Sequence, residues 1–246
     1  GGAIIIDGSA DGPTTLTNCK IENCYSQLGS AIMIQGSKPV TIINSEINRC
    51  ISGGGNVDNS GGAIRTYGSV SASLYLTGVQ FSENYARRNV NYNNTLEKDG
   101  NGGALFWNAR GTNNTKCVID GCEFAYNRSD DNGGAIKSQA TIEFVNNTTK
   151  IHNNSAPIGG GLYIEGYTGG ASVSGARTIR YSLNEFMEVY DNSSPSYEYD
   201  GKTFSGKGAG VHLYFGDKMK LEAGSAIELE MNGSRIYNNI SDGAES

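Results

Sequence analysis

The chain has 246 residues, a formal net charge of −6 and only 18% charged residues. This balance disfavours nucleic acid as a partner, because its recognition depends on clustered Lys and Arg. No apolar run approaches the roughly 20 residues of a membrane-spanning helix, so we expect no membrane insertion by this segment. The 35 glycines favour many tight turns and few solvated helices.

A small-small-small-apolar tetrad of the GGAI type returns seven times along the chain. The tetrads begin at Gly1, Gly29, Gly61, Gly102, Gly133, Gly159 and Gly208. Each is followed by a second signature: an apolar residue, two variable residues, Asn or Cys, one variable residue, then Ser or Ala. These signatures are Ile21–Ser26, Ile47–Ser52, Phe81–Ala86, Phe124–Ser129, Ile151–Ala156, Val189–Ser194 and Ile236–Ser241. Paired motifs at such a period predict stacked repeats, so we expect residues 1–246 to form one solenoid domain within a longer repeat protein.

Apolar residues alternate with polar ones around both motifs, which is typical of short strands separated by turns. Seven and five residues before the second signature stand mostly apolar residues, and in the fifth repeat this spacing aligns Phe144 with Cys117 of the fourth. Three strands per repeat, with like strands stacked in parallel, predict an all-β, right-handed parallel β-helix of about seven rungs. A β-propeller is the alternative, but its blades need four strands and a longer repeat.

The Asn or Cys of the second signature is expected to stack at one corner of the solenoid. Asn tolerates a left-handed backbone, and its amide can bond the neighbouring rung. We therefore interpret this column as a structural ladder rather than as catalytic machinery. Its members are Cys24, Cys50, Asn84, Asn127, Asn154, Asn192 and Asn239.

The paired GGAI and FxxN motifs resemble the repeats of the polymorphic outer membrane proteins of chlamydiae and of related β-helix surface proteins. The resemblance covers nearly the whole chain. In that family the repeats form a surface-exposed passenger that is implicated in adhesion or assembly. The resemblance therefore implies an extracellular, cell-surface location and a binding or structural role.

The five cysteines fall on positions assigned to the interior or the corner, so we expect them to be free, buried thiols. Disulfides between Cys117 and Cys122 or between Cys19 and Cys24 are the alternative. The spacings contain no CxxC pair, and we expect no metal site and no cofactor. Two Asn-x-Thr sequons lie in polar, loop-like stretches and are candidate glycosylation sites: Asn93 and Asn113.

Three long insertions, residues 51–60, 85–101 and 193–207, leave the solenoid from the same corner. They should therefore line one edge of the rod, and insertions gathered on one side are commonly the binding side. The alternative is solvated decoration without a ligand. The candidate ligand-binding residues of these loops are Arg87, Arg88, Tyr197 and Tyr199.

The tetrad strand next to these loops should present alternate residues outward. A flat, exposed face that mixes aromatic, amide and charged groups can dock a sugar chain or a protein surface, although an ordinary sheet face is the alternative. The candidates on this face are Arg65, Tyr67, Phe106, Asn108, Lys137, Gln139, Tyr163 and Glu165. The acids Asp7 and Glu165 lie several rungs apart, which disfavours acid–base catalysis here.

Three functions follow as hypotheses. The first is a non-catalytic adhesin or binding scaffold for a glycan or a cell-surface protein. The second is a structural subunit that self-associates through rod ends or faces into a filament or coat. The third is a polysaccharide lyase or hydrolase, since β-helices also carry such sites.

Overall fold

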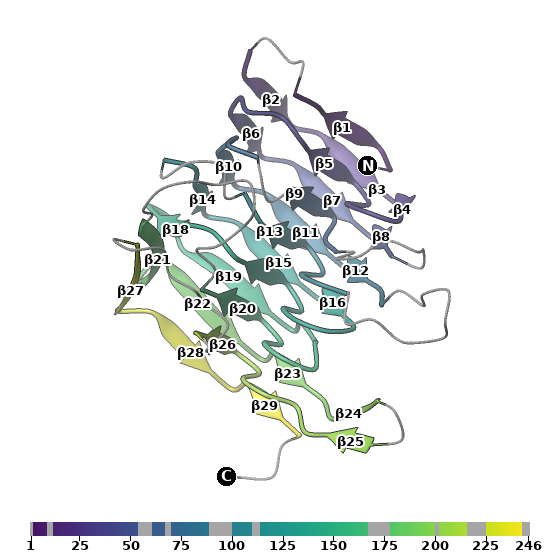
Figure 1. Cartoon of the computed structure of the whole chain (residues 1–246), viewed down its shortest axis with the longest axis vertical. Helices are drawn as coiled ribbons and strands as arrows, with labels where there is room; N and C mark the ends of the chain where they lie inside the picture. The colour runs from purple at the N-terminus through teal and green to yellow at the C-terminus, as the bar shows by residue number, and fades with distance from the viewer. Residues whose placement is uncertain are drawn as a thin grey trace.

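The computed structural model describes residues 2–8, 12–53, 61–66, 70–88, 100–109, 114–166, 178–199, 202–215 and 225–242. Throughout these ranges the regular structure is β-strand, and like strands of successive repeats stack in parallel and in chain order. The predicted parallel β-helix is therefore confirmed. The rungs follow one another from the purple N-terminal end to the yellow C-terminal end of the rod (Figure 1).

Two seven-stranded parallel sheets run along the rod from the tetrad and from the segment that follows it. Sheet A consists of β1 (Ile4–Ile6), β5 (Ile32–Ile34), β9 (Ile64–Thr66), β13 (Leu105–Trp107), β17 (Ile136–Ser138), β20 (Leu162–Glu165) and β26 (Val211–Tyr214). Sheet B consists of β2 (Thr14–Thr17), β6 (Val40–Ile43), β10 (Leu74–Thr77), β14 (Cys117–Asp120), β18 (Ile142–Val145), β21 (Thr178–Asn184) and β27 (Ala226–Asn232).

The second signature forms a third sheet and a short fourth strand that the sequence did not predict. Sheet C consists of β3 (Lys20–Glu22), β7 (Glu46–Asn48), β11 (Gln80–Ser82), β15 (Glu123–Ala125), β19 (Thr149–His152), β22 (Met187–Tyr190) and β28 (Arg235–Tyr237). Sheet D consists of β4 (Tyr25–Ser26), β8 (Ile51–Ser52), β12 (Tyr85–Ala86) and β16 (Arg128–Ser129). Beyond these lie the pair β23 (Ser193–Ser194) with β29 (Ile240–Ser241) and the antiparallel hairpin β24 (Tyr197–Tyr199) with β25 (Lys202–Phe204).

The interior is a continuous apolar column built from the inward residues of the three main sheets. Ile64, Leu105 and Ile136 of sheet A are in register and fully buried. The first residue of the second signature also points inward, and the rings of Phe81 and Phe124 stack with centroids 4.6 Å apart. Each repeat buries its apolar face against its neighbours, so the stack supplies the core that no single repeat has.

The corner residues form one column, and its asparagines are linked by side-chain hydrogen bonds. The Oδ1 atom of Asn127 accepts from both the main-chain N–H and the Nδ2 of Asn84, at 3.1 and 2.9 Å. Asn127 in turn donates to Asn154 Oδ1 through the same two groups, at 2.8 and 3.0 Å. The pattern continues to Asn192 and Asn239. The buried amides of Asn84, Asn127, Asn154 and Asn192 thus tie each rung to the next.

The left-handed backbone at this corner falls on the residue before the ladder, not on the ladder residue itself. Glu83 and Tyr126 have φ values of 55° and 57°, although neither is Gly or Asn. Our expectation that the ladder Asn would occupy this conformation was wrong. The ladder selects Asn for its amide, and the bonded column holds the preceding residue in a conformation that L-residues disfavour.

In sheet B the expected alignment of the fifth rung was wrong by two residues. Cys117 pairs with Ile142, and Ile119 rather than Cys117 pairs with Phe144. The rung accommodates the shift in a longer turn at Asn146 and Asn147, where Asn146 has a φ of 56°. Counting back from the next signature could not reveal this, because turn length changes without disturbing either strand.

All five cysteines are free thiols, but the expectation of burial was wrong for Cys19 and Cys24, which are half-buried near the first rungs. Burial raises the pKa of Cys50 to about 11 and of Cys122 to about 12. In the part of the chain that the structure describes, no helix is long and apolar enough to cross a membrane. The same residues include no cluster of three or more His, Cys, Asp or Glu side chains that could hold a metal ion.

Candidate functional site

The middle of the outward row of sheet A, expected as an exposed binding face, is buried, whereas Ile5 in the first rung is 58% exposed. Arg65, Phe106, Lys137 and Tyr163 are in register on neighbouring strands, as predicted, but their exposed fractions are 4%, 0%, 6% and 7%. Our expectation that Phe106 and Tyr163 form an exposed aromatic surface was therefore wrong. Asn108 is also buried, and Tyr67 lies outside the described residues.

The physical reason is that these side chains pack on one another. The Lys137 Nζ atom lies 5.5 Å from the ring centroid of Phe106 and 5.3 Å from that of Tyr163. The same atom donates to Asn101 Oδ1 at 2.9 Å and lies 3.4 Å from Glu165 Oε2. Asn101 directly precedes the tetrad that begins at Gly102, so the alternation of residues along the strand could not predict its contact with Lys137. The ammonium is thus held by an amide oxygen, a carboxylate and two rings of this chain.

The carboxylates beside this row are paired as well. Glu165 accepts from Gln139 at 2.7 Å, and Asp131 accepts from Asn132 at 2.6 Å. Burial, followed by the charges of Glu165 and Asp131, raises the pKa of Tyr163, so the phenol remains protonated at neutral pH. We interpret this cluster as a buried structural network, because its acid and basic groups satisfy each other rather than facing a substrate.

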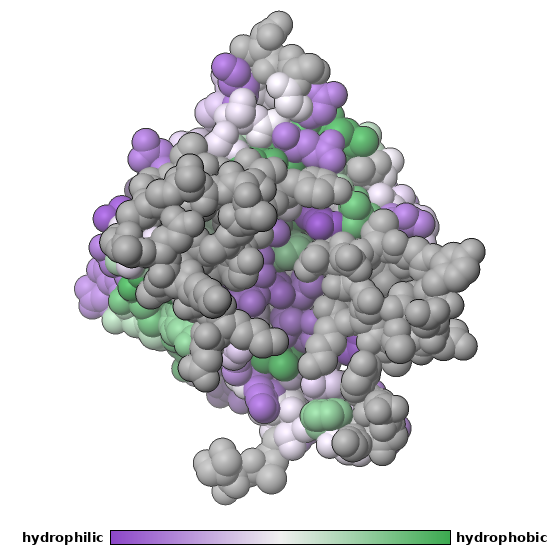
Figure 2. Space-filling view, viewed as in Figure 1, coloured by the Kyte–Doolittle hydropathy of each residue, from purple (hydrophilic) through white to green (hydrophobic). Residues whose placement is uncertain are grey.

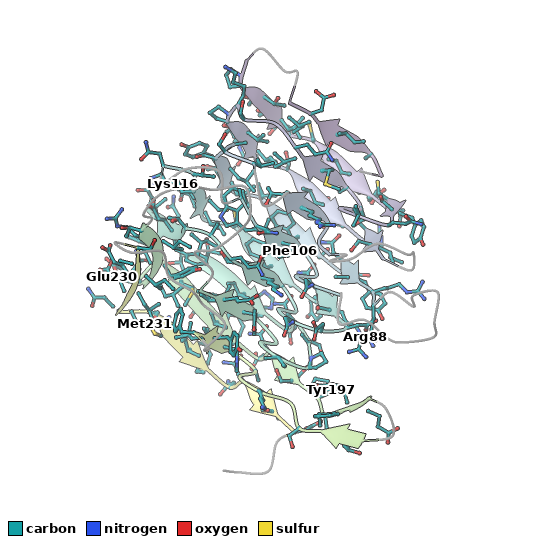
Figure 3. All side chains as sticks on the ribbon, in the orientation of Figure 1. Arg88, Phe106, Lys116, Tyr197, Glu230 and Met231 are labelled. Carbon is teal, nitrogen blue, oxygen red and sulfur yellow. The ribbon has the colours of Figure 1, made fainter. Side chains whose placement is uncertain are left out.

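A pocket of about 790 Å³ lies instead at the loop edge, where two of the predicted insertions meet. Arg87 and Arg88 reach it from the insertion 85–101, and Tyr197 reaches it from the hairpin β24–β25 in the insertion 193–207. Arg88 and Tyr197 lie near each other at one side of the rod, whereas Phe106 lies at its centre (Figure 3). We call this hollow the loop-edge pocket.

The pocket arises from a change of side-chain size along one outward column. Tyr85 pairs with Arg128 across sheet D, and bridges continue the column to Ser155 and Ser193. Two large side chains are therefore followed by two small ones, which leaves a hollow on an otherwise regular surface. Rigid turns border it where the chain leaves the corner, at Pro157 and Pro195.

Asp130 organises the cationic side of the pocket. Its Oδ1 accepts the Tyr85 hydroxyl at 2.7 Å, and its Oδ2 accepts the main-chain N–H of Arg88 at 3.0 Å. Arg88 Nη2 donates back to the Asp130 carbonyl oxygen at 2.6 Å. Burial and the bond to Asp130 raise the pKa of Tyr85 to about 12, so Tyr85 acts as a hydrogen-bond donor and not as a base.

Two guanidinium groups lie over aromatic rings in the pocket wall. Arg128 lies 4.9 Å above the ring centroid of Tyr85, and Arg88 lies 6.0 Å from that of Tyr197. Tyr197 is itself stacked on Phe204, with centroids 5.3 Å apart. These contacts hold planar cations against planar rings and create firm walls from long side chains.

Sequence reasoning found only part of this pocket. It selected Arg87, Arg88 and Tyr197 but missed Arg128 and Asp130, which fall on variable positions in and just after the second signature. Listing the outward residues of the second signature repeat by repeat, as was done for the tetrad strand, could have found them. The side chain of the candidate Tyr199 and the candidates Asn93 and Asn113 lie outside the part of the chain that the structure describes.

On the face toward the viewer in Figure 2, hydrophilic residues predominate in the middle of the view, and described hydrophobic residues gather toward the lower left and the upper right. Comparison with known proteins finds no matching family model, no similar curated protein and no similar solved structure.

Proposed function

We propose that this chain is a non-catalytic, extracellular surface β-helix that binds a glycan at the loop-edge pocket. The observation that carries the proposal is the meeting of two insertions around one pocket lined by three arginines and two tyrosines. Its volume, about 790 Å³, falls in the range of ligand sites. The tyrosine side chains give the pocket apolar surface that a sugar ring can contact, while hydroxyl and guanidinium groups bond sugar oxygens.

The rigid rod suits this role, because the ladder and the paired sheets hold the pocket walls in place before any ligand arrives. Arg128 and Ser155 stand on adjacent rungs of the corner, so their spacing is set by strand pairing. Preorganised walls lower the entropic cost of binding. The surface location is part of the proposal and rests on the repeat motifs.

A glycan array, probed with the purified chain, tests the proposal. We expect saturable binding that weakens about tenfold or more in Tyr197→Ala, because one wall of the pocket and the ring that supports Arg88 are lost. Tyr75→Ala is the matched control, since Tyr75 is half-buried on sheet B and away from the pocket, and it should bind normally. Equal weakening in both variants, binding to proteins alone, or cleavage of the glycan would each overturn the proposal.

A further inference from the structure

The loop-edge pocket carries a charge that its proposed role does not by itself explain. Among the described residues, Arg87, Arg88 and Arg128 line it together with one carboxylate, Asp130. The lining is thus cationic by two charges, three positive against one negative, in a chain whose formal net charge is −6. A local excess of the opposite sign on an acidic protein attracts anions and disfavours neutral or cationic ligands.

Two of these arginines retain capacity to bind. The Arg88 Nε atom is buried and has no hydrogen-bond acceptor among the described residues. The Arg128 side chain is 63% exposed, and its contact with Asp130 is long, at 3.5 Å. A buried donor without an acceptor is costly, so an anionic oxygen placed beside it is favoured.

We infer that the ligand is an acidic glycan, whose sugar rings carry carboxylate or sulfate groups. This inference rests on the proposed function and narrows it to one ligand class. Guanidinium groups pair with planar or tetrahedral oxyanions in forked geometry, and the Arg128 guanidinium lies 4.9 Å from the Tyr85 ring centroid on a side chain that is 63% exposed. The anionic substituent meets the arginines while the sugar ring fills the rest of the pocket beside the tyrosine side chains.

The pocket fits a saccharide better than a small anion or an acidic peptide. A lone phosphate would leave most of about 790 Å³ and both tyrosines unused. An extended peptide commonly binds by adding a strand to an open sheet edge. The corner column below the pocket offers none along its described length, since Arg128, Ser155 and Ser193 are bridged rung to rung.

Calorimetric titration with a matched pair of ligands tests the inference. An oligogalacturonide carries one carboxylate per ring, and its full methyl ester has the same rings without the charge. We expect the acid to bind at least about tenfold more tightly than the ester, the effect of one charge-assisted hydrogen bond. Raising the salt concentration from about 0.05 to about 0.5 M should weaken the binding of the acid and leave that of the ester unchanged. A heparin-derived oligosaccharide, tested in parallel, shows whether sulfate serves as well as carboxylate.

Arg128→Gln is the decisive variant because its guanidinium is exposed and its loss should not disturb folding, which thermal unfolding checks. It should lower the affinity for the acidic ligand about tenfold. Arg128→Lys should lower it less, since the positive charge remains although the paired N–H donors of the guanidinium are lost. Arg180→Gln is the matched control: Arg180 is also exposed, and it is paired with Glu228 outside the pocket. Its affinity should be unchanged.

The failures are distinguishable. If the methyl ester binds as tightly as the acid, and Tyr197→Ala weakens both, the acidic ligand class is wrong while glycan binding stands. If an oligoglutamate peptide binds at the pocket and no saccharide does, both the ligand class and the proposed function are wrong. Equal loss of affinity in Arg128→Gln and Arg180→Gln would show general charge attraction and would also overturn the inference.

Discussion

The outward row of sheet A and the loop-edge pocket use the same chemistry with opposite results. In the row, Lys137 lies over Phe106 and Tyr163; in the pocket, Arg128 lies over Tyr85. The Lys137 side chain is 8% exposed and bonded on several sides, whereas the Arg128 side chain is 63% exposed. The same contact between a cation and an aromatic ring is therefore buried in the row and exposed in the pocket. The difference lies in what the neighbouring segments supply, not in the residue types.

The most direct way to break this comparison is to remove Phe106. Because the ring is fully buried, Phe106→Ala should lower the free energy of unfolding by about 3 to 5 kcal/mol. Ile5→Ala is the control, since Ile5 occupies the same row in the first rung but is 58% exposed. Chemical denaturation measures both. Normal stability with lost glycan binding in Phe106→Ala would restore the sheet face as the binding site.

A second test concerns the ladder that holds both regions in register. Asn127→Ala removes an acceptor for Asn84 and the donors to Phe81 and Asn154, so buried groups lose their partners. We expect a loss of about 2 to 3 kcal/mol in unfolding free energy. Asn153→Asp, at the exposed neighbouring corner residue of the next rung, should cost less, because Asp tolerates the φ of 53° there about as well as Asn. An equal cost in both variants would mean that the ladder has no special stabilising role.

Alkaline pH sharpens the contrast between the two tyrosines. Burial raises the pKa of both Tyr85 and Tyr163 above the ordinary value of 10. The folded state then binds the phenolic proton more tightly than the unfolded state does. Their contribution to stability is present below pH 10 and is lost as the pH rises from there through the folded-state pKa. Tyr163→Phe should remove more of this pH dependence than Tyr85→Phe; the reverse order would contradict the assigned burial of the row.

The hydrogen bond between Tyr85 and Asp130 can be tested by spectroscopic titration. In Asp130→Asn the tyrosine loses a charged acceptor, so its pKa should fall from about 12 toward the ordinary value. Ultraviolet absorbance against pH, with Tyr85→Phe identifying the band, measures the shift. An unchanged titration would show that Asp130 does not organise the pocket.

The smallest expected effect lies at the left-handed corner. Glu83→Gly should raise the free energy of unfolding by up to about 1 kcal/mol, because glycine adopts a φ of 55° without strain. Glu46→Gly, at the first residue of β7 in sheet C, is the opposite case, since its backbone is ordinary strand, and it should lower stability. Thermal unfolding compares them. Destabilisation in both would mean that the corner carries no strain.

The sequence by itself determined the architecture. The tetrads and the second signature predicted the rungs, the parallel stacking and the inward residues such as Phe81 and Phe124, because a repeat written in register leaves only one way to bury its apolar side. It also predicted that the long insertions line one edge. These properties follow from local alternation and from the repeat period, both of which are visible in a linear chain.

Only the tertiary structure decided which outward residues are available to a ligand. Asn101 and Glu165, distant in the chain, close over Lys137 and convert a predicted face into a buried network. Conversely, Ser155 and Ser193 leave space beside Arg128, and a hairpin from a later repeat supplies Tyr197. Exposure depends on the volumes and hydrogen bonds of neighbours that meet only after folding. That is why the repeat pattern predicted the scaffold and the structure was needed to find the pocket.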